Sequence, residues 1–434
     1  MPLIYDLSSY LPVLVAVAVV ATWIISIRIY PVIIYIVQKK NLMDEPDERS
    51  SHIKKVPTLG GVGMFLAFSL ALMLFGIFVA LEEGELVRLI SIVAATIILL
   101  FLGIKDDLLV LAPKKKFLGQ IFAAAIVILA TDVRISSFGG IMGIWELHYF
   151  GSVIFTLCVF VVIINAFNLT DGIDGLAGSI ATLCSAIFGF FFLVNGEMFL
   201  SLVSFTLVGA LIGFLSHNFS ERQKLFMGDS GSLFLGYMLA YQGVCFVEVS
   251  ASETALYTVP HAPIILLALL SYPMVDSLRV FAVRIYNGKH PFHADRNHIH
   301  HRFVDVGYSH MKATFAISIS NVLMVGLIWL INDWDPTVQF FTGLFAGMGL
   351  YMWVFVVRTN DELLQYSIDN TIQGKTLGAN TINPVEILNR KRLRILKQRL
   401  KVEATNNSKK KSDSQFRFIT DESKREISKA KQSG

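Results

Sequence analysis

The chain has 434 residues, of which 54% are hydrophobic and only 16% are charged. A soluble domain carries about 25% charged residues, so this composition excludes an ordinary soluble or disordered protein and indicates a polytopic membrane protein. The three cysteines, Cys158, Cys184 and Cys245, all lie in apolar runs, which argues against a disulfide framework and leaves no zinc-type spacing.

Apolar runs of membrane length recur along the chain. A helix needs about 20 mostly apolar residues to cross a bilayer, and most runs reach that length, although the third and fourth are shorter. We therefore expect an all-α protein with about eleven transmembrane helices. These helices are expected near residues 11–37, 60–81, 88–104, 117–133, 150–167, 176–194, 199–218, 231–248, 262–284, 313–331 and 338–357.

The positive charges between these runs predict the orientation of the chain. Loops on one side hold 15 Lys and Arg residues, whereas the loops on the other side hold only Arg134. Because cytoplasmic loops are the ones enriched in Lys and Arg, we expect the N-terminus outside and the C-terminus in the cytoplasm. The side with 15 Lys and Arg residues consists of the loops 38–59, 105–116, 168–175, 219–230 and 285–312, of which 168–175 has none.

The composition changes after the last apolar run. We expect residues 1–357 to form one membrane domain and residues 358–434 a basic cytoplasmic tail. Near 384–402, leucines and isoleucines are spaced among basic residues, which predicts an amphipathic helix. Such a helix would lie on an anionic membrane surface or pack, solvated, on its own protein. The Lys-, Ser- and Asn-rich remainder is expected to be disordered.

Two acidic motifs stand at the ends of predicted spans on the cytoplasmic side. Asp106 and Asp107 follow the third span directly. An ionised acid at the end of a span must be solvated, paired with a cation or bound to a metal. These two acids are therefore either functional residues or simply the solvated first residues of a loop. The second motif, residues 165–175, reads NAFNLTDGIDG. Its Asp171 and Asp174 share one face if the segment is helical, and its two acids and two amides exceed what helix capping requires.

Two further motifs complete the set. Residues 226–232 read FMGDSGS, in which Asp229 can cap the eighth span or offer a carboxylate to a metal while the helix N-terminus faces a phosphate. Residues 288–302 contain five of the ten histidines. Without a cysteine partner or an HExxH pattern, zinc is disfavoured, and Arg296 and Arg302 favour an anion or sugar-phosphate site. Carboxylates with oxygen-only character suit Mg²⁺, so the combination indicates phosphoryl transfer with a lipid partner.

These motifs resemble those of the polyprenyl-phosphate N-acetylhexosamine-1-phosphate transferase family, over about residues 10–357. That family includes the WecA and TagO type, which loads N-acetylglucosamine phosphate, and more distantly the MraY type. The histidine segment is similar to the WecA and TagO type, which disfavours a muramyl-pentapeptide substrate. The matching segments are PTLGG (57–61), the Asp106–Asp107 pair, NAFNLTDGIDGL (165–176), FMGDSGSL (226–233) and PFHADRNHIHHRF (291–303).

The resemblance implies a reaction. N-acetylglucosamine 1-phosphate would pass from UDP-N-acetylglucosamine to undecaprenyl phosphate, releasing UMP, as the first membrane step of a cell-surface glycan pathway. It also implies Mg²⁺, with Mn²⁺ as a substitute, a bacterial inner membrane location with a cytoplasmic active site, and a homodimer. No nucleic-acid partner is expected.

The resemblance also implies residue roles. Asp229 would be the principal metal ligand, and Asp106 and Asp107 would contact the lipid phosphate and act as base or second metal contact. Whether Asp106 positions, deprotonates or attacks stays open, and we favour single displacement. His300 is placed in the catalytic set. Substrate-binding residues would be Lys54, Lys55, Lys116, Asn168, Asp171, Asp174, Phe226, Arg296, His298, His301 and Arg302.

Two alternatives remain at this stage. The donor sugar could be another UDP-hexosamine, namely UDP-GalNAc, UDP-QuiNAc or UDP-FucNAc, or the muramyl-pentapeptide nucleotide. The second alternative is an ion-coupled transporter. Against a transporter, the acids gather at one face, and mid-span acids in two symmetric halves are lacking.

Overall fold

The computed structural model describes residues 10–40, 43–44, 56–79, 81–109, 111–290 and 297–357. The tail from residue 358, with its predicted amphipathic helix, lies outside them, so that prediction is untested. The elements are α1 (Leu11–Lys40), β1 (Met43–Asp44), β2 (Val56–Pro57), α2 (Gly60–Phe78), α3 (Glu83–Leu109), α4 (Pro113–Thr131), η2 (Ile141–Gly143), α5 (Tyr149–Thr170), α6 (Leu176–Val194), α7 (Met198–Asn218), α8 (Gly228–Ala251), α9 (Ala262–Leu269), α10 (Ser271–Tyr286), α11 (Ile299–Asp305), α12 (His310–Leu330) and α13 (Pro336–Val356).

The protein is an all-α, polytopic membrane protein. Among the described residues, nine helices are long and apolar enough to cross a membrane, and the bent pair α9–α10 adds a tenth. The one remaining predicted span, 117–133, corresponds to α4, whose first turn carries Lys114, Lys115 and Lys116. The predicted apolar runs are thus found as helices, while the number that cross the bilayer and their orientation stay predictions.

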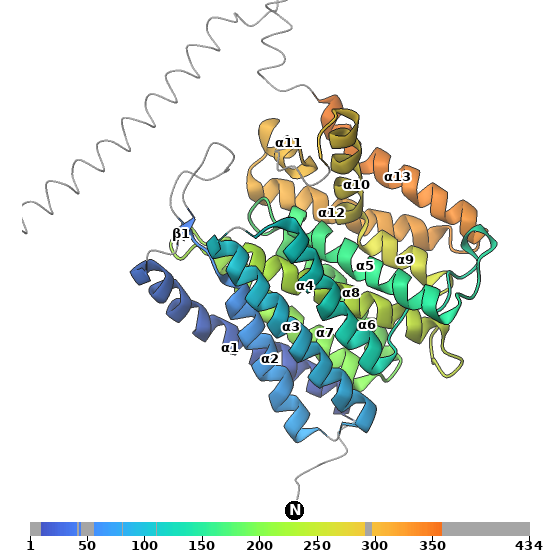
Figure 1. Cartoon of the computed structure of the whole chain (residues 1–434), viewed down its shortest axis with the longest axis horizontal. Helices are drawn as coiled ribbons and strands as arrows, with labels where there is room; N and C mark the ends of the chain where they lie inside the picture. Colours follow the sequence, from blue (N-terminus) through green and yellow to red (C-terminus); the bar gives the residue numbers. More distant parts are fainter. Residues whose placement is uncertain are drawn as a thin grey trace, which may run out of the picture. The chain divides into compact units, whose positions relative to one another are not determined.

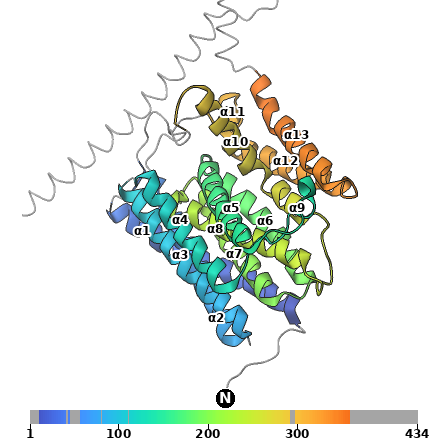
Figure 2. The same cartoon turned by 45° about the vertical axis from the view of Figure 1, so that its right-hand side comes forward.

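Helix α8 lies at the centre of the bundle. Figures 1 and 2 show α1 to α8 as one bundle, with α9 to α13 packed along one side of it. Almost every residue of α8 is buried, because α2, α3, α5 and α6 all pack against it. Its mean hydropathy is nevertheless among the lowest of the spans. Because α8 is central and buried, its polar N-terminus lies inside the protein.

The predicted span 262–284 is broken into α9 and α10, which meet at an angle of 74°. Pro273 has no backbone N–H, so it cannot bond to the carbonyl of Leu269 four residues earlier. That carbonyl instead accepts from the side-chain amide of Asn321 at 2.8 Å and from the thiol of Cys184 at 3.3 Å. Polar groups from α12 and α6 therefore satisfy the break. All three cysteines of the chain are free.

Candidate active site

Four helix ends meet around one lysine. The Lys116 ammonium, on the first turn of α4, lies 2.6 Å from a carboxylate oxygen of Asp106 and 3.2 Å from one of Asp229. It also donates to the side-chain oxygen of Asn168, at 3.4 Å. Asp106 belongs to the last turn of α3, Asn168 to the end of α5 and Asp229 to the start of α8. Folding thus brings together three motifs that are far apart in sequence.

Asn168 and Asp229 form the centre of this cluster. The Asn168 amide donates to a carboxylate oxygen of Asp229 and, at 2.8 Å, to the hydroxyl of Ser232. The other oxygen of Asp106 accepts from the backbone N–H of Leu111 at 2.6 Å, which fixes Asp106 at the α3–α4 turn. We call Asp106, Lys116, Asn168 and Asp229 the lysine-centred network. Its acceptor atoms are all oxygens.

Asp107 has a different environment from its neighbour Asp106. Its two carboxylate oxygens accept from the backbone N–H groups of Asp229 and Ser230, at 2.7 and 3.2 Å. The first N–H groups of a helix have no partner within the helix, and α8 has no side-chain cap of its own. Asp107 therefore caps α8 from α3 and fixes the backbone that carries Asp229.

Asp171, directly after α5, has no hydrogen-bond donor among the described residues, unlike the other acids here. Burial, together with the nearby carboxylates of Asp229 and Asp107, raises the pKa of Asp171 to about 8. The site thus has more negative charge than Lys116 neutralises. An additional cation would favour the ionised form of Asp171.

Asp174 connects its own loop to the loop 219–227 and to the start of α12. Its carboxylate lies 2.6 Å from the Lys224 ammonium and 2.8 Å from the Nδ1 atom of His310, and its carbonyl accepts from the Thr314 hydroxyl at 2.9 Å. Burial disfavours ionisation of Asp174, but the hydrogen bonds from His310 and Lys224 outweigh it and lower the pKa of the carboxyl. Neither Lys224 nor His310 belongs to a predicted motif, since each is a lone polar residue between expected spans.

The segments PTLGG and FMGDSGS lie side by side. Phe226 donates its backbone N–H to the carbonyl of Pro57, and Gly60 and Gly61 donate to the carbonyls of Phe226 and Met227, each at 2.9 Å. A Cβ on Gly61 would lie 2.0 Å from the backbone nitrogen of Gly231, so only glycine allows α2 to approach α8 this closely. The Phe226 ring is half-buried, with the Lys224 ammonium 5.5 Å from its centre.

The histidine segment reaches the same loop from the other side of the bundle. A Cβ on Gly172 would lie 2.0 Å from the Nε2 atom of His300, so His300 packs directly against the residue that follows Asp171. Burial lowers the pKa of His300 well below its usual value, and His301 and His298 lower it further, so the ring is neutral. His300 and His301 are adjacent, with ring centres 4.4 Å apart.

Not every predicted site residue joins this cluster. Arg302 donates to the carbonyl of Val357 at the end of α13 and lies toward the ring of Phe355, so the structure does not bring it to the lysine-centred network. Lys54, Lys55 and Arg296 lie outside the described residues. The remaining predicted residues are placed at the network, at the loop 171–175, at residues 226–227 or on the histidine segment.

The sequence analysis also missed Asp276, which is buried on α10 and bonded to His298 at 2.8 Å. Asp276 is a single acid within an expected apolar span. Such an acid is a functional candidate by default, and this signal could have found it.

Residues 89–247, which include most of these motifs, match the sequence profile of glycosyl transferase family 4. A decaprenyl-phosphate N-acetylglucosaminephosphotransferase of Mycolicibacterium smegmatis is 32% identical over 300 residues, which cover 65% of this chain and 72% of the relative. This chain belongs to glycosyl transferase family 4. It is therefore a transferase, and its membrane helices hold the acidic and histidine motifs together.

Other relatives have similar names. A probable undecaprenyl-phosphate N-acetylglucosaminyl 1-phosphate transferase of Bacillus subtilis is 31% identical over 327 residues, 73% of this chain and 87% of the relative. An undecaprenyl-phosphate alpha-N-acetylglucosaminyl 1-phosphate transferase of Escherichia coli is 26% identical over 321 residues, 71% of this chain and 83% of the relative. The similarity thus covers between 65% and 73% of this chain.

Proposed function

We propose that this glycosyl transferase family 4 enzyme transfers N-acetylglucosamine 1-phosphate from UDP-N-acetylglucosamine to undecaprenyl phosphate and releases UMP. The observation that supports it best is the lysine-centred network at the N-terminus of the buried helix α8. The names of the three relatives describe a polyprenyl phosphate acceptor and an N-acetylglucosamine phosphate group.

The reaction brings two anions together, so positioning and charge neutralisation carry most of the catalysis. The Lys116 ammonium and the N-terminal dipole of α8 both favour phosphate oxygens at this place. A phosphate monoester is largely dianionic at pH 7, so the lipid phosphate needs little help from a base. We assign Asp106 to holding Lys116 in position while the lipid phosphate attacks the β-phosphorus of the nucleotide sugar.

The donor atoms of the site fit a hard divalent cation such as Mg²⁺. Asp229 offers carboxylate oxygens, Asn168 offers the amide oxygen that accepts from Lys116, and Asp171 adds a carboxylate without a donor among the described residues. These residues would hold the ion, with Asp106 in reach of the same network. Asp107 would act mainly through α8, since both of its oxygens already accept backbone N–H groups. When bound, Mg²⁺ neutralises the pyrophosphate and the leaving UMP.

We place the nucleotide at the loop 171–175 and at Phe226, and the sugar and pyrophosphate at His298, His300 and His301. Asp174 would act by joining the loops around the nucleotide, because its carboxylate is already paired with Lys224 and His310. The Lys- and Arg-rich loops favour a cytoplasmic position for this face, and the family resemblance supports a bacterial inner membrane. A homodimer remains part of the proposal on the family resemblance alone.

The test is UMP release by the purified, detergent-solubilised full chain, given UDP-N-acetylglucosamine and undecaprenyl phosphate, with and without Mg²⁺. Release that requires both the lipid and the metal is the expected result. Release with a different UDP-hexosamine only would keep the reaction and change the donor. No release across a panel of UDP-sugars by folded protein would refute the proposal, and ion-dependent solute uptake would then favour a transporter.

Asp229→Asn tests the central carboxylate. It keeps the shape of the side chain and removes its charge, so we expect kcat/KM to fall on the order of 10³-fold. Asp335→Asn is the matched control, because Asp335 only caps α13 at the loop after α12. Unchanged kcat/KM in Asp229→Asn would remove Asp229 from the proposed metal site.

A further inference from the structure

One face of α10 holds the histidine segment through three side chains. Tyr272, Asp276 and Arg279 are four and three residues apart, so they lie along one stripe of the helix. Arg279 donates to the backbone and side-chain oxygens of Asn297, at 2.6 and 3.1 Å. Asp276 binds residues 298 and 299, and Tyr272 binds His300. Each residue of 297–300 is thus attached to α10 by at least one hydrogen bond.

Asp276 fixes both the backbone and one ring. It is 1% exposed, and its oxygens accept from the backbone N–H of Ile299 and from Nδ1 of His298, each at 2.8 Å. An ionised carboxylate only accepts hydrogen bonds, so Nδ1 of His298 carries a proton. In the neutral ring this makes Nε2 the acceptor. Asp276 therefore determines which nitrogen of His298 is left for a ligand.

Tyr272 fixes the second ring in the opposite sense. Its hydroxyl is buried and lies 3.0 Å from Nδ1 of His300, the only side-chain hydrogen-bond partner that it has among the described residues. The hydroxyl proton needs an acceptor, so Tyr272 donates to Nδ1 and the proton of the neutral ring lies on Nε2. That Nε2 atom is buried, has no partner among the described residues, and packs against Gly172 beside Asp171. It is a hydrogen-bond donor without an acceptor.

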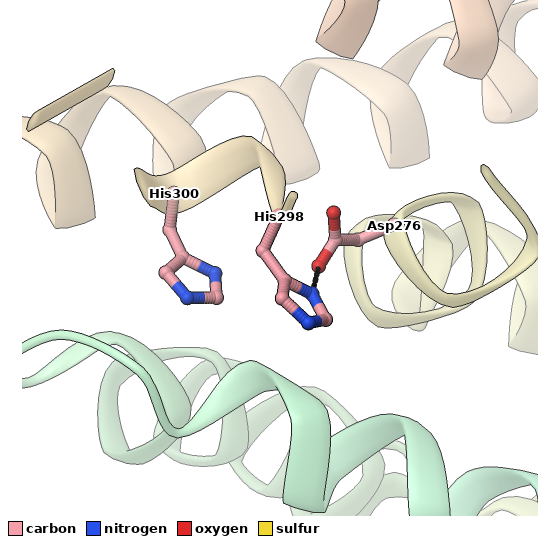
Figure 3. A group of neighbouring side chains, drawn as sticks. All are labelled: Asp276, His298 and His300. Atoms are coloured by element: carbon pink, nitrogen blue, oxygen red, sulfur yellow. Dashed lines mark hydrogen bonds and ion pairs between the residues drawn. The ribbon is translucent and has the colours of Figure 1, made fainter. Parts of the chain in front are cut away.

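Figure 3 shows that both rings extend to the same side of the short helical segment that carries them, with Asp276 beside His298. Their ring centres are 5.3 Å apart and the rings are stacked at 17°. A fixed acceptor and a fixed donor thus stand next to each other. This arrangement is suited to a ligand that offers one N–H or O–H group and one anionic or carbonyl oxygen.

We propose that Asp276 and Tyr272 are positioning residues that set opposite tautomers in His298 and His300, so that His298 accepts from and His300 donates to the acylamino-sugar phosphate of the donor. This inference rests on the proposed function for the identity of that ligand. The hydrogen-bond assignment itself rests only on α10 and the residues 298–300. Neither Asp276 nor Tyr272 touches the ligand.

A bound metal ion is the competing use of this cluster. One ligand atom each of Asp276, His298 and His300 lies within 4.8 Å of the others. However, both oxygens of Asp276 and one nitrogen of each ring are already engaged in the hydrogen bonds described above. Metal analysis of the purified protein separates the two uses. One equivalent of tightly held zinc that Asp276→Asn releases would overturn the proposal.

The direct test is ¹⁵N NMR of the full chain with labelled histidine, in lipid and at a pH where the rings are neutral. Each signal is assigned by replacing that histidine with Gln. We expect His298 to carry its proton on Nδ1 and His300 on Nε2. Asp276→Asn should mix the tautomers of His298, and Tyr272→Phe those of His300. The same tautomer in both wild-type rings would overturn the proposal, whether or not the enzyme uses UDP-N-acetylglucosamine.

The kinetic test uses the same variants. When a variant no longer fixes its histidine ring, we expect kcat/KM for the nucleotide sugar to fall about 10- to 100-fold, as it does when a carboxylate that orients a histidine is removed in other proteins. The KM for the lipid should stay unchanged. Ser277→Ala is the matched control, since Ser277 follows Asp276 on α10 and its hydroxyl has no partner among the described residues. If Asp276→Asn does not fold, Tyr272→Phe still decides. Equal losses for both substrates would reduce Asp276 to a structural residue.

Discussion

Two helix N-termini in this protein are capped by an aspartate from another helix, and they use it differently. Asp107 of α3 gives both of its oxygens to backbone N–H groups of α8. Asp276 of α10 gives one oxygen to the backbone of α11 and the other to the ring of His298. Neither helix has a side-chain cap of its own. Asp107 thus orients a peptide segment, whereas Asp276 orients a segment and a functional side chain together.

The difference shows how an acid inside a membrane protein can be structural and functional at once. Capping by Asp107 places the carboxylate of Asp229 next to Lys116, and capping by Asp276 places the ring of His298 next to that of His300. In both cases an unpaired buried N–H would be unfavourable by about 1–3 kcal/mol. Asp107 and Asp276 each remove this unfavourable free energy and, by the same hydrogen bonds, orient a side chain of the site.

Removing the cap of α8 should have the largest effect. In Asp107→Ala, the N–H groups of Asp229 and Ser230 lose their acceptors, and the backbone under Asp229 becomes free to move. We expect a loss of about 2 kcal/mol in stability and of 10²–10³-fold in kcat. Asp107→Asn keeps one acceptor and should lose less of both. Stability measured by thermal unfolding in detergent, together with UMP release, checks this.

The outcome against the capping role is equally clear. If Asp107→Asn and Asp107→Ala have the same low kcat and both unfold at the wild-type temperature, Asp107 acts by its charge on the substrate or metal. The comparison with Asp276 would then no longer hold.

Sequence reasoning found the helices and most of the acidic motifs because both depend on local patterns. Apolar runs of about 20 residues predict spans, and acids beside glycines at a span end are conspicuous, as at Asp229. The break at Pro273 was missed, because its compensation by Asn321 and Cys184 comes from other helices. Lys224 and His310 were missed for the same reason, since their partners are distant in sequence, whereas Asp276 was overlooked although an acid within an expected span is itself a signal.

A second variant changes the surroundings of His300 and leaves the capped N-terminus of α8 unchanged. Gly172→Ala adds a methyl group where the Nε2 atom of His300 now packs, 2.0 Å from the new Cβ. The ring must move away from the loop that carries Asp171, while Asp107 and α8 are untouched. We expect kcat/KM for the nucleotide sugar to fall about 10- to 100-fold and stability to change little. Gly151→Ala is the control, because a Cβ there meets nothing within 4 Å.

A Gly172→Ala enzyme with wild-type kcat/KM would show that His300 does not need to approach this loop. It would also separate the histidine segment from the lysine-centred network. The tautomers of His298 and His300 could then still be opposite, but they would have no consequence for the donor.

The smallest effect is expected where an acid joins loops and caps nothing. The pKa of Asp174 is lowered because the hydrogen bonds from His310 and Lys224 outweigh the effect of burial. A carboxyl with a lowered folded-state pKa stabilises the protein above its unfolded pKa, about 3.9, and this contribution is lost as pH falls through the folded pKa. Wild-type stability should therefore fall below about pH 4 by roughly 1 kcal/mol more than that of Asp174→Asn. Thermal unfolding from neutral pH downward measures the difference, with Asp132→Asn as the control for an exposed Asp–Arg pair. Parallel curves for wild type and Asp174→Asn would mean that the link between the loops 171–175 and 219–227 and the start of α12 does not depend on this charge.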